Sequence, residues 1–330
     1  MKSFGGLWSQ ICDLETLRNA MNRAARGKRH RGPVIRFFED AENQLKMLQS
    51  ELLSGSYRPA PFSQFKIRDP KPRMISCAVF RDRIVHHATC CVIGPLLERS
   101  FIADSYACRV GKGSHSAVLR AQQFARENSY FAKLDIRRYF DSVDHDCLLT
   151  PLFSRFREKP LRKLLELIVR FPLTGQMPGK GVPIGNLTSQ WFANFYLDAA
   201  DHLIKEQWGV RGYVRYMDDL LLFDQTREKL EEIISNLGLW LKVERGLEIK
   251  IERLRLARCM EGIPFLGWRL FPGFLWLQHG RFHRCRRLIK KREREFAEGA
   301  IDEKSLAASV RAICAGIRVL RPRFQFKIVG

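Results

Sequence analysis

The most informative segment of this chain is YVRYMDDLLLF, residues 213–223. Its two apolar runs are typical of buried strands, and the short turn between them carries Asp218 and Asp219, so the segment predicts a β-hairpin with two adjacent carboxylates at its tip. A second strand pattern, residues 130–136, occurs earlier in the chain and contains Asp135 near its end. An acidic side chain in such a place is held rigidly enough to bind a ligand group.

Three carboxylates on neighbouring strands would repel one another unless cations lie between them. A pair of divalent ions meets this need, and Mg²⁺ suits it because it binds a few carboxylate oxygens together with water and substrate phosphates. Two such ions about 3.5–4 Å apart can activate an attacking 3′-hydroxyl and stabilise a leaving pyrophosphate. The alternative is an ordinary turn at Asp218 and Asp219, which the apolar strands on both sides, the preceding Tyr216 and the basic chain disfavour.

The composition points to a folded protein with a polyanionic partner. The 330 residues include 57 Lys and Arg against 35 Asp and Glu, a formal net charge of +22, and 45% are hydrophobic, which excludes a disordered chain. Nucleic acid is the expected partner, and a cationic surface without a ligand is the alternative. The chain has no apolar run of about 18 residues and no leader-like start, so we expect no membrane association and a cytoplasmic location.

The cysteines and histidines do not suggest a structural metal site. The nine cysteines include no C-x-x-C pair, which excludes a disulfide framework and a ribbon-type zinc site as interpretations of this sequence. His279, His283 and Cys285 could bind zinc. They lie in a run so rich in Lys and Arg that phosphate contact or a solvated helix is the favoured interpretation.

The remaining segments show an alternation of helices and extended strands. Helices are expected over residues 14–25, 34–53 and 81–97, and the basic loop 27–33 is a candidate nucleic-acid contact. Four prolines interrupt residues 55–75, where an alternating pattern predicts strands with cations on one face. Residues 281–294 hold eight Lys or Arg in fourteen positions on a helix-compatible pattern, which is typical of a helix that contacts phosphates.

At these residues the chain resembles the reverse transcriptases. Tyr216-Met217-Asp218-Asp219 is similar to the active-site box of that family, and Asp135 followed by Phe140 is similar to its first-carboxylate box. Residues 263–268 are similar to its primer-grip box. The order and spacing of the boxes agree, and the resemblance extends from about residue 13 to residue 330.

Within this family the chain is most similar to the enzymes of diversity-generating retroelements, bacterial and phage reverse transcriptases that copy a template RNA with frequent errors at adenine. Residues 70–76, 106–115 and 181–190 carry this likeness. Group II intron enzymes usually have Gln where Ile184 stands and Ser-Pro in place of Ser189-Gln190. Retron enzymes, the nearer competitor by length, generally lack the Leu-Thr-Ser-Gln form.

The resemblance implies a catalytic centre with two Mg²⁺ ions, for which Mn²⁺ can substitute. The implied catalytic carboxylates are Asp135, Asp218 and Asp219, with Ile136 as a further metal ligand. The implied nucleotide-binding residues are Lys71, Arg73, Phe140, Ile184, Gly185, Gln190, Tyr216 and Met217. The implied nucleic-acid-binding residues are Arg281, Arg284, Arg286, Arg287, Lys290 and Lys291.

The resemblance also implies a physical role for several of these residues. Phe140 would lie under the incoming sugar and exclude a 2′-hydroxyl, and Gly185 would let the backbone approach a nucleotide closely. Ile184 cannot hydrogen-bond around the new base pair, so lower fidelity is expected. Lys250 and Arg253 are candidates for the general acid of pyrophosphate, but neither aligns cleanly and Arg keeps its proton below about pH 12, so neither is assigned.

The expected architecture is an α+β right-hand polymerase, with a palm of antiparallel sheet and helices. The expected parts are a basic helical N-terminal extension (1–54), fingers (55–134), a palm with inserted finger–palm helices (135–272) and a basic helical thumb (273–330). The expected activity is RNA-directed synthesis of DNA from a DNA primer or an RNA 3′ end, in mutagenic retrohoming. The expected partners are template RNA, the cDNA or DNA primer, dNTPs and a small basic oligomeric accessory variability protein.

Two other functions remain open. The first is a retron, group II intron-like or abortive-infection reverse transcriptase. The second is a polymerase-like RNA-binding scaffold without catalysis, which the presence of all three carboxylates disfavours.

Overall fold

The fold is described from a computed structural model that covers residues 5–68, 72–172, 175 and 177–315. Its helices are α1 (Leu7–Cys12), α2 (Leu14–Ala25), α3 (Gly32–Glu39), α4 (Ala41–Ser54), α5 (Phe80–Glu98), α6 (Ser114–Glu127), α7 (Tyr139–Ser142), α8 (His145–Arg155), α9 (Lys159–Val169), α10 (Leu187–Tyr196), α11 (Asp198–His202), α12 (Arg227–Arg245), α13 (His279–Ala297) and α14 (Glu303–Ala315). Its strands are β1 (Ser63–Ile67), β2 (Arg73–Cys77), β3 (Tyr130–Asp135), β4 (Gly212–Tyr216), β5 (Asp219–Asp224), β6 (Arg255–Arg258), β7 (Ile263–Phe265), β8 (Trp268–Leu270) and β9 (Leu275–Leu277).

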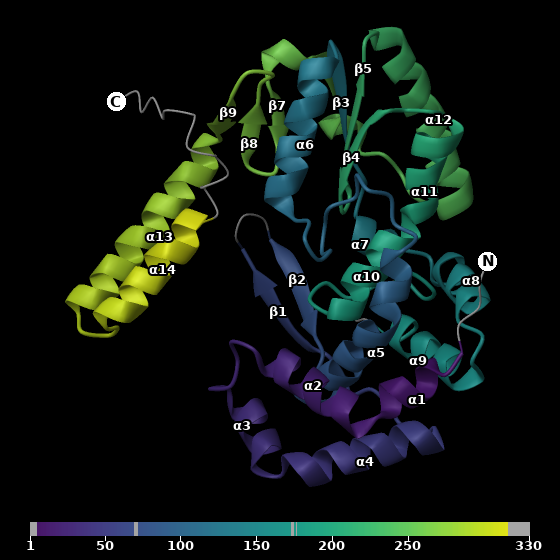
Figure 1. Ribbon diagram of the computed structural model, residues 1–330, viewed down its shortest axis with the longest axis vertical. Coiled ribbons are helices and arrows are strands. Elements are labelled where there is room, and N and C mark those ends of the chain that lie inside the picture. The colour runs from purple at the N-terminus through teal and green to yellow at the C-terminus, as the bar shows by residue number, and fades with distance from the viewer. Residues whose placement is uncertain (1–4, 69–71, 173–174, 176, 316–330) are drawn as a thin grey trace.

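A four-stranded antiparallel sheet in the order β4-β5-β3-β6 forms the centre of the upper part of the molecule (Figure 1). Side chains alternate between the two faces of this sheet, and helices cover both faces. Leu220 and Leu222 of β5 pack with α12 in one core, whereas Leu221 and Phe223 pack with α6 in another. The two covered faces explain why these strands are almost continuously apolar.

The lower part of the molecule is helical and carries a separate β1–β2 hairpin (Figure 1). Helix α2 packs along α5 through small and apolar side chains, among them Leu17, Ala20 and Ala24. The same core also includes Leu52 and Tyr57, on either side of the predicted boundary at residues 54 and 55. The predicted N-terminal extension and fingers are therefore parts of one folded unit with the palm helices.

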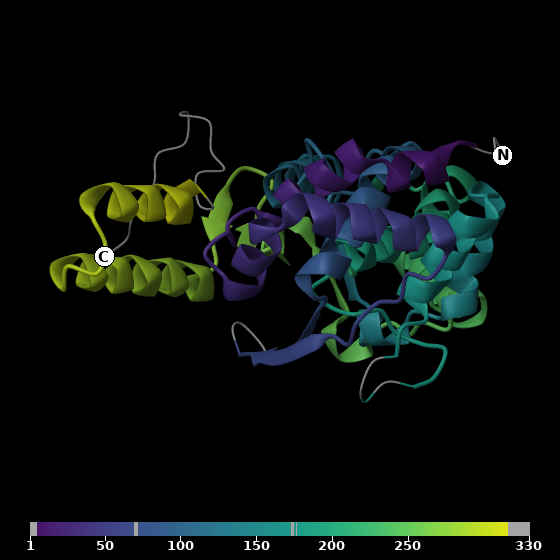
Figure 2. The same cartoon turned by 90° about the horizontal axis from the view of Figure 1, so that it is seen from below.

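The C-terminal part begins with a three-stranded antiparallel sheet in the order β7-β8-β9. Trp268 and Phe265 of this sheet join the core beneath α6. Helices α13 and α14 then pack on each other and project away from the rest of the molecule (Figures 1 and 2). None of the side chains of these two helices, both of which lie in the described part of the chain, is buried.

The structure confirms the expected α+β class and most of the expected elements, but it corrects one helix. The predicted helix over residues 34–53 is two helices, α3 and α4, which meet at Asp40 with φ −133° and ψ 40°. The Asp40 carboxylate accepts a hydrogen bond of 2.8 Å from the Asn43 side chain. This bond joins two side chains and does not cap α4, but Asp is a poor residue for a helix interior, and periodicity alone does not reveal the break.

No helix in the described part of the chain is both long enough and apolar enough to cross a membrane. All nine cysteines are free thiols.

Candidate active site

The hairpin predicted from residues 213–223 is confirmed. Strand β4 pairs with β5 so that Tyr216 lies opposite Asp219, which leaves Met217 and Asp218 as the two-residue loop. Met217 has a φ of 58°, the left-handed conformation that such a loop requires. The turn therefore displays Asp218 at the end of the sheet.

The first carboxylate lies beside this turn. Strand β3 pairs with β5 so that Asp135 is directly opposite Asp219, and side chains at opposed positions have Cβ atoms about 4.5–5.5 Å apart. The side chains of Asp135 and Asp219 are 18% and 33% exposed. The three predicted catalytic residues are thus brought together at one end of the central sheet, within reach of solvent.

The acidic cluster disfavours ionisation of its most buried member. Burial raises the pKa of Asp218 to about 6, and the negative charges of Asp219 and Asp135 act in the same direction, while Arg73 opposes them. A nearby cation would stabilise the ionised form of this carboxyl group.

Two basic side chains partly neutralise the cluster. The Lys133 ammonium lies 3.6 Å from the Asp219 carboxylate, and the Arg253 guanidinium donates to Asp135 at 3.2 Å. Lys250, the other candidate for a general acid, donates its backbone N–H to the Asp135 carbonyl at 2.7 Å. Of the two candidates, Arg253 is therefore the one for which the structure records a side-chain contact with a predicted catalytic carboxylate.

The carboxylates suit Mg²⁺ in their chemistry without forming a complete cage. Within the described residues no group of three or more His, Cys, Asp and Glu side chains converges on a preformed metal position, which also excludes such a cage at His279 and His283. Mg²⁺ characteristically uses one or two carboxylates and completes its octahedron with water and substrate phosphates. The three Asp side chains offer oxygen donors of the kind that Mg²⁺ prefers. The raised pKa of Asp218 shows that the cluster lacks a fully compensating positive charge, which a metal ion would supply. Ile136 is buried, and since its aliphatic side chain carries no donor atom, only its backbone carbonyl could serve as a ligand.

The fingers hairpin β1–β2 brings one predicted phosphate-binding residue toward the carboxylates. Arg73 is exposed at the start of β2, opposite Ile67, and its charge acts on Asp218. Lys71 lies outside the described residues.

Residues 181–185 form a loop that bridges the palm to the fingers. The Val182 N–H donates to the Phe140 carbonyl at 2.8 Å, and the Ser76 N–H on β2 donates to the Ile184 carbonyl at 2.9 Å. Gly185 has a φ of 123°, and a Cβ atom there would lie 2.8 Å from the Ile75 side chain. The close approach that Gly185 permits is therefore to strand β2, and its contact with a nucleotide stays a prediction.

The other predicted nucleotide-binding residues surround the same region. Phe140 is half-buried on α7, with its ring centroid 5.7 Å from that of Tyr139. Gln190 on α10 and Tyr216 beside the catalytic turn are also half-buried. Their contacts with substrate stay predictions.

Helix α13 carries the predicted nucleic-acid-binding residues, and they are not equivalent. Arg281 donates to the Leu266 carbonyl at 2.7 Å and lies over the Trp268 ring at 5.5 Å, so it anchors the helix to the β7–β8 turn. Beyond it, Arg284, Arg286, Arg287, Lys290 and Lys291 are exposed. A groove of about 480 Å³ runs along this part of the helix. It is lined by His283, Arg286, Arg287, Lys290, Lys291 and Arg294.

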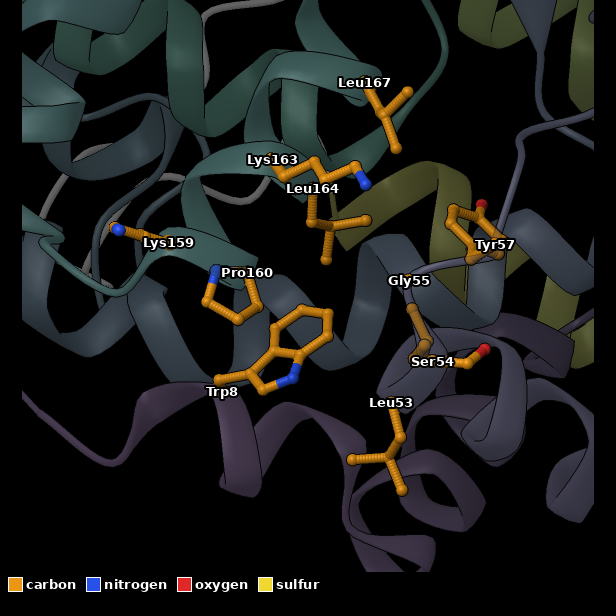
Figure 3. Close-up of a pocket in the computed structure, with 11 residues that line it drawn as sticks. Trp8, Leu53, Ser54, Gly55, Tyr57, Lys159, Pro160, Lys163, Leu164 and Leu167 are labelled. Atoms are coloured by element: carbon orange, nitrogen blue, oxygen red, sulfur yellow. The ribbon is translucent and has the colours of Figure 1, made fainter.

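A second cavity lies elsewhere. It has a volume of about 300 Å³ and is lined by residues of α1, of the end of α4 and of α9, among them Trp8, Leu53 and Lys163 (Figure 3). None of the predicted site residues lines it.

Sequence reasoning missed two residues near the carboxylates. Lys133 could have been found because it lies two positions before Asp135 on a strand and so shares its face. Arg215 is fully buried behind the catalytic turn. A single arginine within an apolar strand pattern was the available signal.

Comparison with known proteins identifies the family of the chain. The sequence pattern of the family described as reverse transcriptase (RNA-dependent DNA polymerase) matches residues 66–270, more than half of the chain. The chain is 24% identical over 270 residues to Protein YkfC of Escherichia coli K12, covering 69% of this chain and 71% of that one. It is also 24% identical over 174 residues to the group II intron-encoded protein LtrA of Lactococcus lactis, covering 50% of this chain and 28% of LtrA.

Solved telomerase structures share the fold. The apo telomerase of Candida tropicalis matches with a TM-score of 0.52 at 11% identity, over 82% of this chain and 61% of that one. The Candida albicans enzyme matches with a TM-score of 0.50 at 12% identity, over 68% of this chain and 46% of that one. The chain therefore spans less than two thirds of LtrA and of these telomerases. The family match, which includes all three carboxylates, establishes that the chain belongs to the reverse transcriptase (RNA-dependent DNA polymerase) family.

Proposed function

We propose that this chain extends a DNA primer or an RNA 3′ end on an RNA template by two-metal nucleotidyl transfer. The observation that carries the proposal is the register of the central sheet, which sets Asp135 opposite Asp219 beside the turn that holds Asp218. Family membership supports the same reaction. A scaffold without catalysis would not need three carboxylates held against their mutual repulsion.

The residues around the carboxylates have complementary tasks. Asp135, Asp218 and Asp219 would hold two Mg²⁺ ions, or Mn²⁺ in their place, and these ions supply activation of the 3′-hydroxyl and stabilisation of the leaving pyrophosphate. Arg73 is placed to bind the triphosphate because a guanidinium forms a bidentate fork with phosphate. Phe140 would pack against the incoming sugar.

The cationic helix α13 would hold the template–primer duplex by its phosphates. Its exposed Arg and Lys side chains stand on a projecting helix whose side chains are all at least partly exposed, so the charges remain accessible. Phosphate contacts of this kind are independent of sequence and sensitive to salt. One of the structurally similar telomerases was solved with a fragment of telomeric RNA, which is consistent with an RNA partner here.

The test of the reaction is extension of an oligo(dT) primer on poly(rA) with Mg²⁺. Asp218→Asn removes a metal ligand without changing the cationic surface, so it should abolish extension and leave template–primer binding within about twofold. Asp224→Asn is the matched control, because Asp224 ends the same strand at the opposite end of the sheet. Normal extension by the Asp218→Asn variant, or equal losses in both variants, would exclude the two-metal assignment.

We further propose that the enzyme serves a diversity-generating retroelement and copies template adenines inaccurately. The support is Ile184, whose carbonyl is bound to β2 and whose apolar, half-buried side chain stands where related enzymes usually have Gln. A small basic oligomeric accessory protein is then the expected partner. The relation to LtrA keeps a group II intron-like enzyme as the alternative, beside a retron or abortive-infection enzyme, and a neighbouring template/variable repeat pair with a small accessory gene would decide between them.

Fidelity tests this proposal at a single position. A polar restraint on the new base pair is worth about 1–3 kcal/mol, so Ile184→Gln should lower misincorporation opposite adenine roughly ten- to a hundredfold. Sequencing of cDNA from one defined RNA measures the change, and Ile184→Leu, which remains apolar, is the control. If the Ile184→Gln variant copies adenines as inaccurately as the parent enzyme, the Ile184 side chain has a packing role alone and does not set fidelity.

A further inference from the structure

A buried ion pair lies directly behind the catalytic turn. Arg215 on β4 and Asp201 on α11 are both 0% exposed. Arg215 lies on β4 two positions before the turn residue Met217, and its guanidinium donates to the Met217 carbonyl. The guanidinium therefore reaches the turn from inside the protein, on the side away from solvent.

One edge of the guanidinium is fixed by Asp201. Its Nε donates to Asp201 Oδ1 at 2.7 Å, and its Nη2 donates to Asp201 Oδ2 at 2.5 Å. The Tyr213 hydroxyl donates to the same carboxylate at 2.7 Å. Burial opposes the charge of Arg215, yet the Asp201 carboxylate raises the guanidinium pKa above its ordinary value.

The remaining nitrogen holds the turn. Nη1 donates to the Met217 carbonyl at 3.2 Å and to the Asn194 side-chain oxygen at 3.1 Å. Asn194 is fixed in turn, because its amide donates to the Ala107 carbonyl at 2.6 Å. The guanidinium thus links the carbonyl of the turn to helices α10 and α11.

The buried ion pair and the left-handed backbone of Met217 each carry a cost in folding free energy. A buried ion pair is often no more stabilising than well-packed apolar residues of similar size. Met217, the residue whose carbonyl Arg215 binds, has a φ of 58°, and a non-glycine residue keeps such a conformation only when its surroundings hold it. The two costs meet at Met217, the residue directly before Asp218, because Arg215 donates to its carbonyl.

We propose that Arg215 is a positioning residue, whose guanidinium fixes the Met217 carbonyl and so sets Asp218 and Asp219 relative to Asp135. The inference rests on the proposed nucleotidyl transfer at these carboxylates. Small displacements of catalytic groups are expensive, since a misplacement of about 1 Å can lower a rate a hundredfold. The competing explanation is that the pair only fastens α11 to the sheet.

The test replaces the whole pair by apolar residues. Arg215→Met combined with Asp201→Leu leaves no unpaired buried charge, so the double variant should fold. We expect an unchanged Kd for template–primer, a kcat lowered about ten- to a hundredfold, and a several-fold increase in the Mg²⁺ concentration for half-maximal rate. Tyr213→Phe is the matched control, because it removes a hydrogen bond to Asp201 and keeps the bond from Arg215 to Met217; it should lower the melting temperature without lowering kcat.

Arg215→Lys provides a second variant, with rates expressed per folded molecule. Lysine can pair with Asp201 but has no planar fork with which to bind Met217 as well, so the same loss of kcat and the same weaker response to Mg²⁺ are expected. Parental kcat and parental Mg²⁺ dependence in a folded Arg215 variant would overturn the inference. This outcome differs from failure of the proposed function, which Asp218→Asn reports separately.

Discussion

At the scale of single residues, burial raises the pKa of a carboxyl group behind the Met217–Asp218 turn as it does that of Asp218 itself. Asp198 on α11 is 7% exposed, and one of its carboxylate oxygens has no hydrogen-bond partner. Burial raises the pKa of Asp198 to about 6, with the nearby Asp201 adding to the effect and His202 opposing it. The buried Arg215 is paired with Asp201, so it does not fully compensate Asp198.

This pKa predicts how stability depends on pH. The folded pKa is above the usual value of 3.8, so the contribution of Asp198 to stability is fully present below about pH 4 and is lost as pH rises through 6. Asp198→Asn should therefore be more stable than the parent above pH 6, by on the order of 3 kcal/mol, and less dependent on pH between 4 and 6. Urea denaturation across this range, in EDTA, measures the difference. Parallel pH profiles for the two proteins would contradict the assignment.

At the scale of elements, α13 and the loop over residues 181–185 illustrate two ways of attaching a functional segment. The loop is tied to α7 and to β2 by backbone hydrogen bonds, so any displacement of the fingers hairpin is transmitted to Ile184. Helix α13 has no buried side chain among its residues and is anchored near its start by Arg281. The Arg and Lys side chains that follow Arg281 on this helix are exposed, so their number can be changed without disturbing the core.

Because these side chains on α13 are exposed, their contribution to template–primer binding can be tested by substitution. Replacing Arg286, Arg287, Lys290 and Lys291 by Gln should weaken template–primer binding and reduce the log–log salt slope by roughly one unit per lost phosphate contact. Fluorescence anisotropy at several salt concentrations measures the slope. Replacing Lys229 and Lys242 on α12 controls for the loss of general positive charge and should change the slope little. An unchanged slope in the thumb variant would mean that this run is only a solvated face.

At the scale of the whole molecule, one continuous core links the N-terminal helices to the palm. Leu17, Leu45 and Leu48 are 0% exposed and belong to the same cluster as Leu134 and Leu220. The N-terminal segment therefore covers apolar surface of α5 that would otherwise meet water.

Two truncations should behave in opposite ways. Removing residues 1–54 should prevent cooperative folding, because it uncovers the apolar face of α5. Removing residues 284–330 should leave a protein whose melting temperature lies within a few degrees of the parent, because α13 and α14 contribute no buried side chains. Circular dichroism melts of the two proteins test this contrast. A stable, cooperatively folded protein without residues 1–54 would show that the N-terminal helices are an appended unit.

The sequence by itself determined the features that depend on local pattern. The hairpin around Asp218, the strand before Asp135, the helices over residues 14–25 and 81–97 and the basic helix α13 follow from periodicities of 2 and 3.6 residues and from turn chemistry, which act within a few residues. The break at Asp40 was missed because the helix-compatible pattern continues across the one residue whose backbone leaves the helical conformation.

Only the tertiary structure decided which distant residues meet. The pairing of Asp135 with Asp219 is a matter of strand register, and the contact of Arg253 with Asp135 joins residues far apart in the chain. The close packing of Gly185 on Ile75 and the burial of Arg215 against Asp201 depend on how helices and hairpins dock. Such contacts are set by the packing of whole elements, whose geometry no short window of sequence contains.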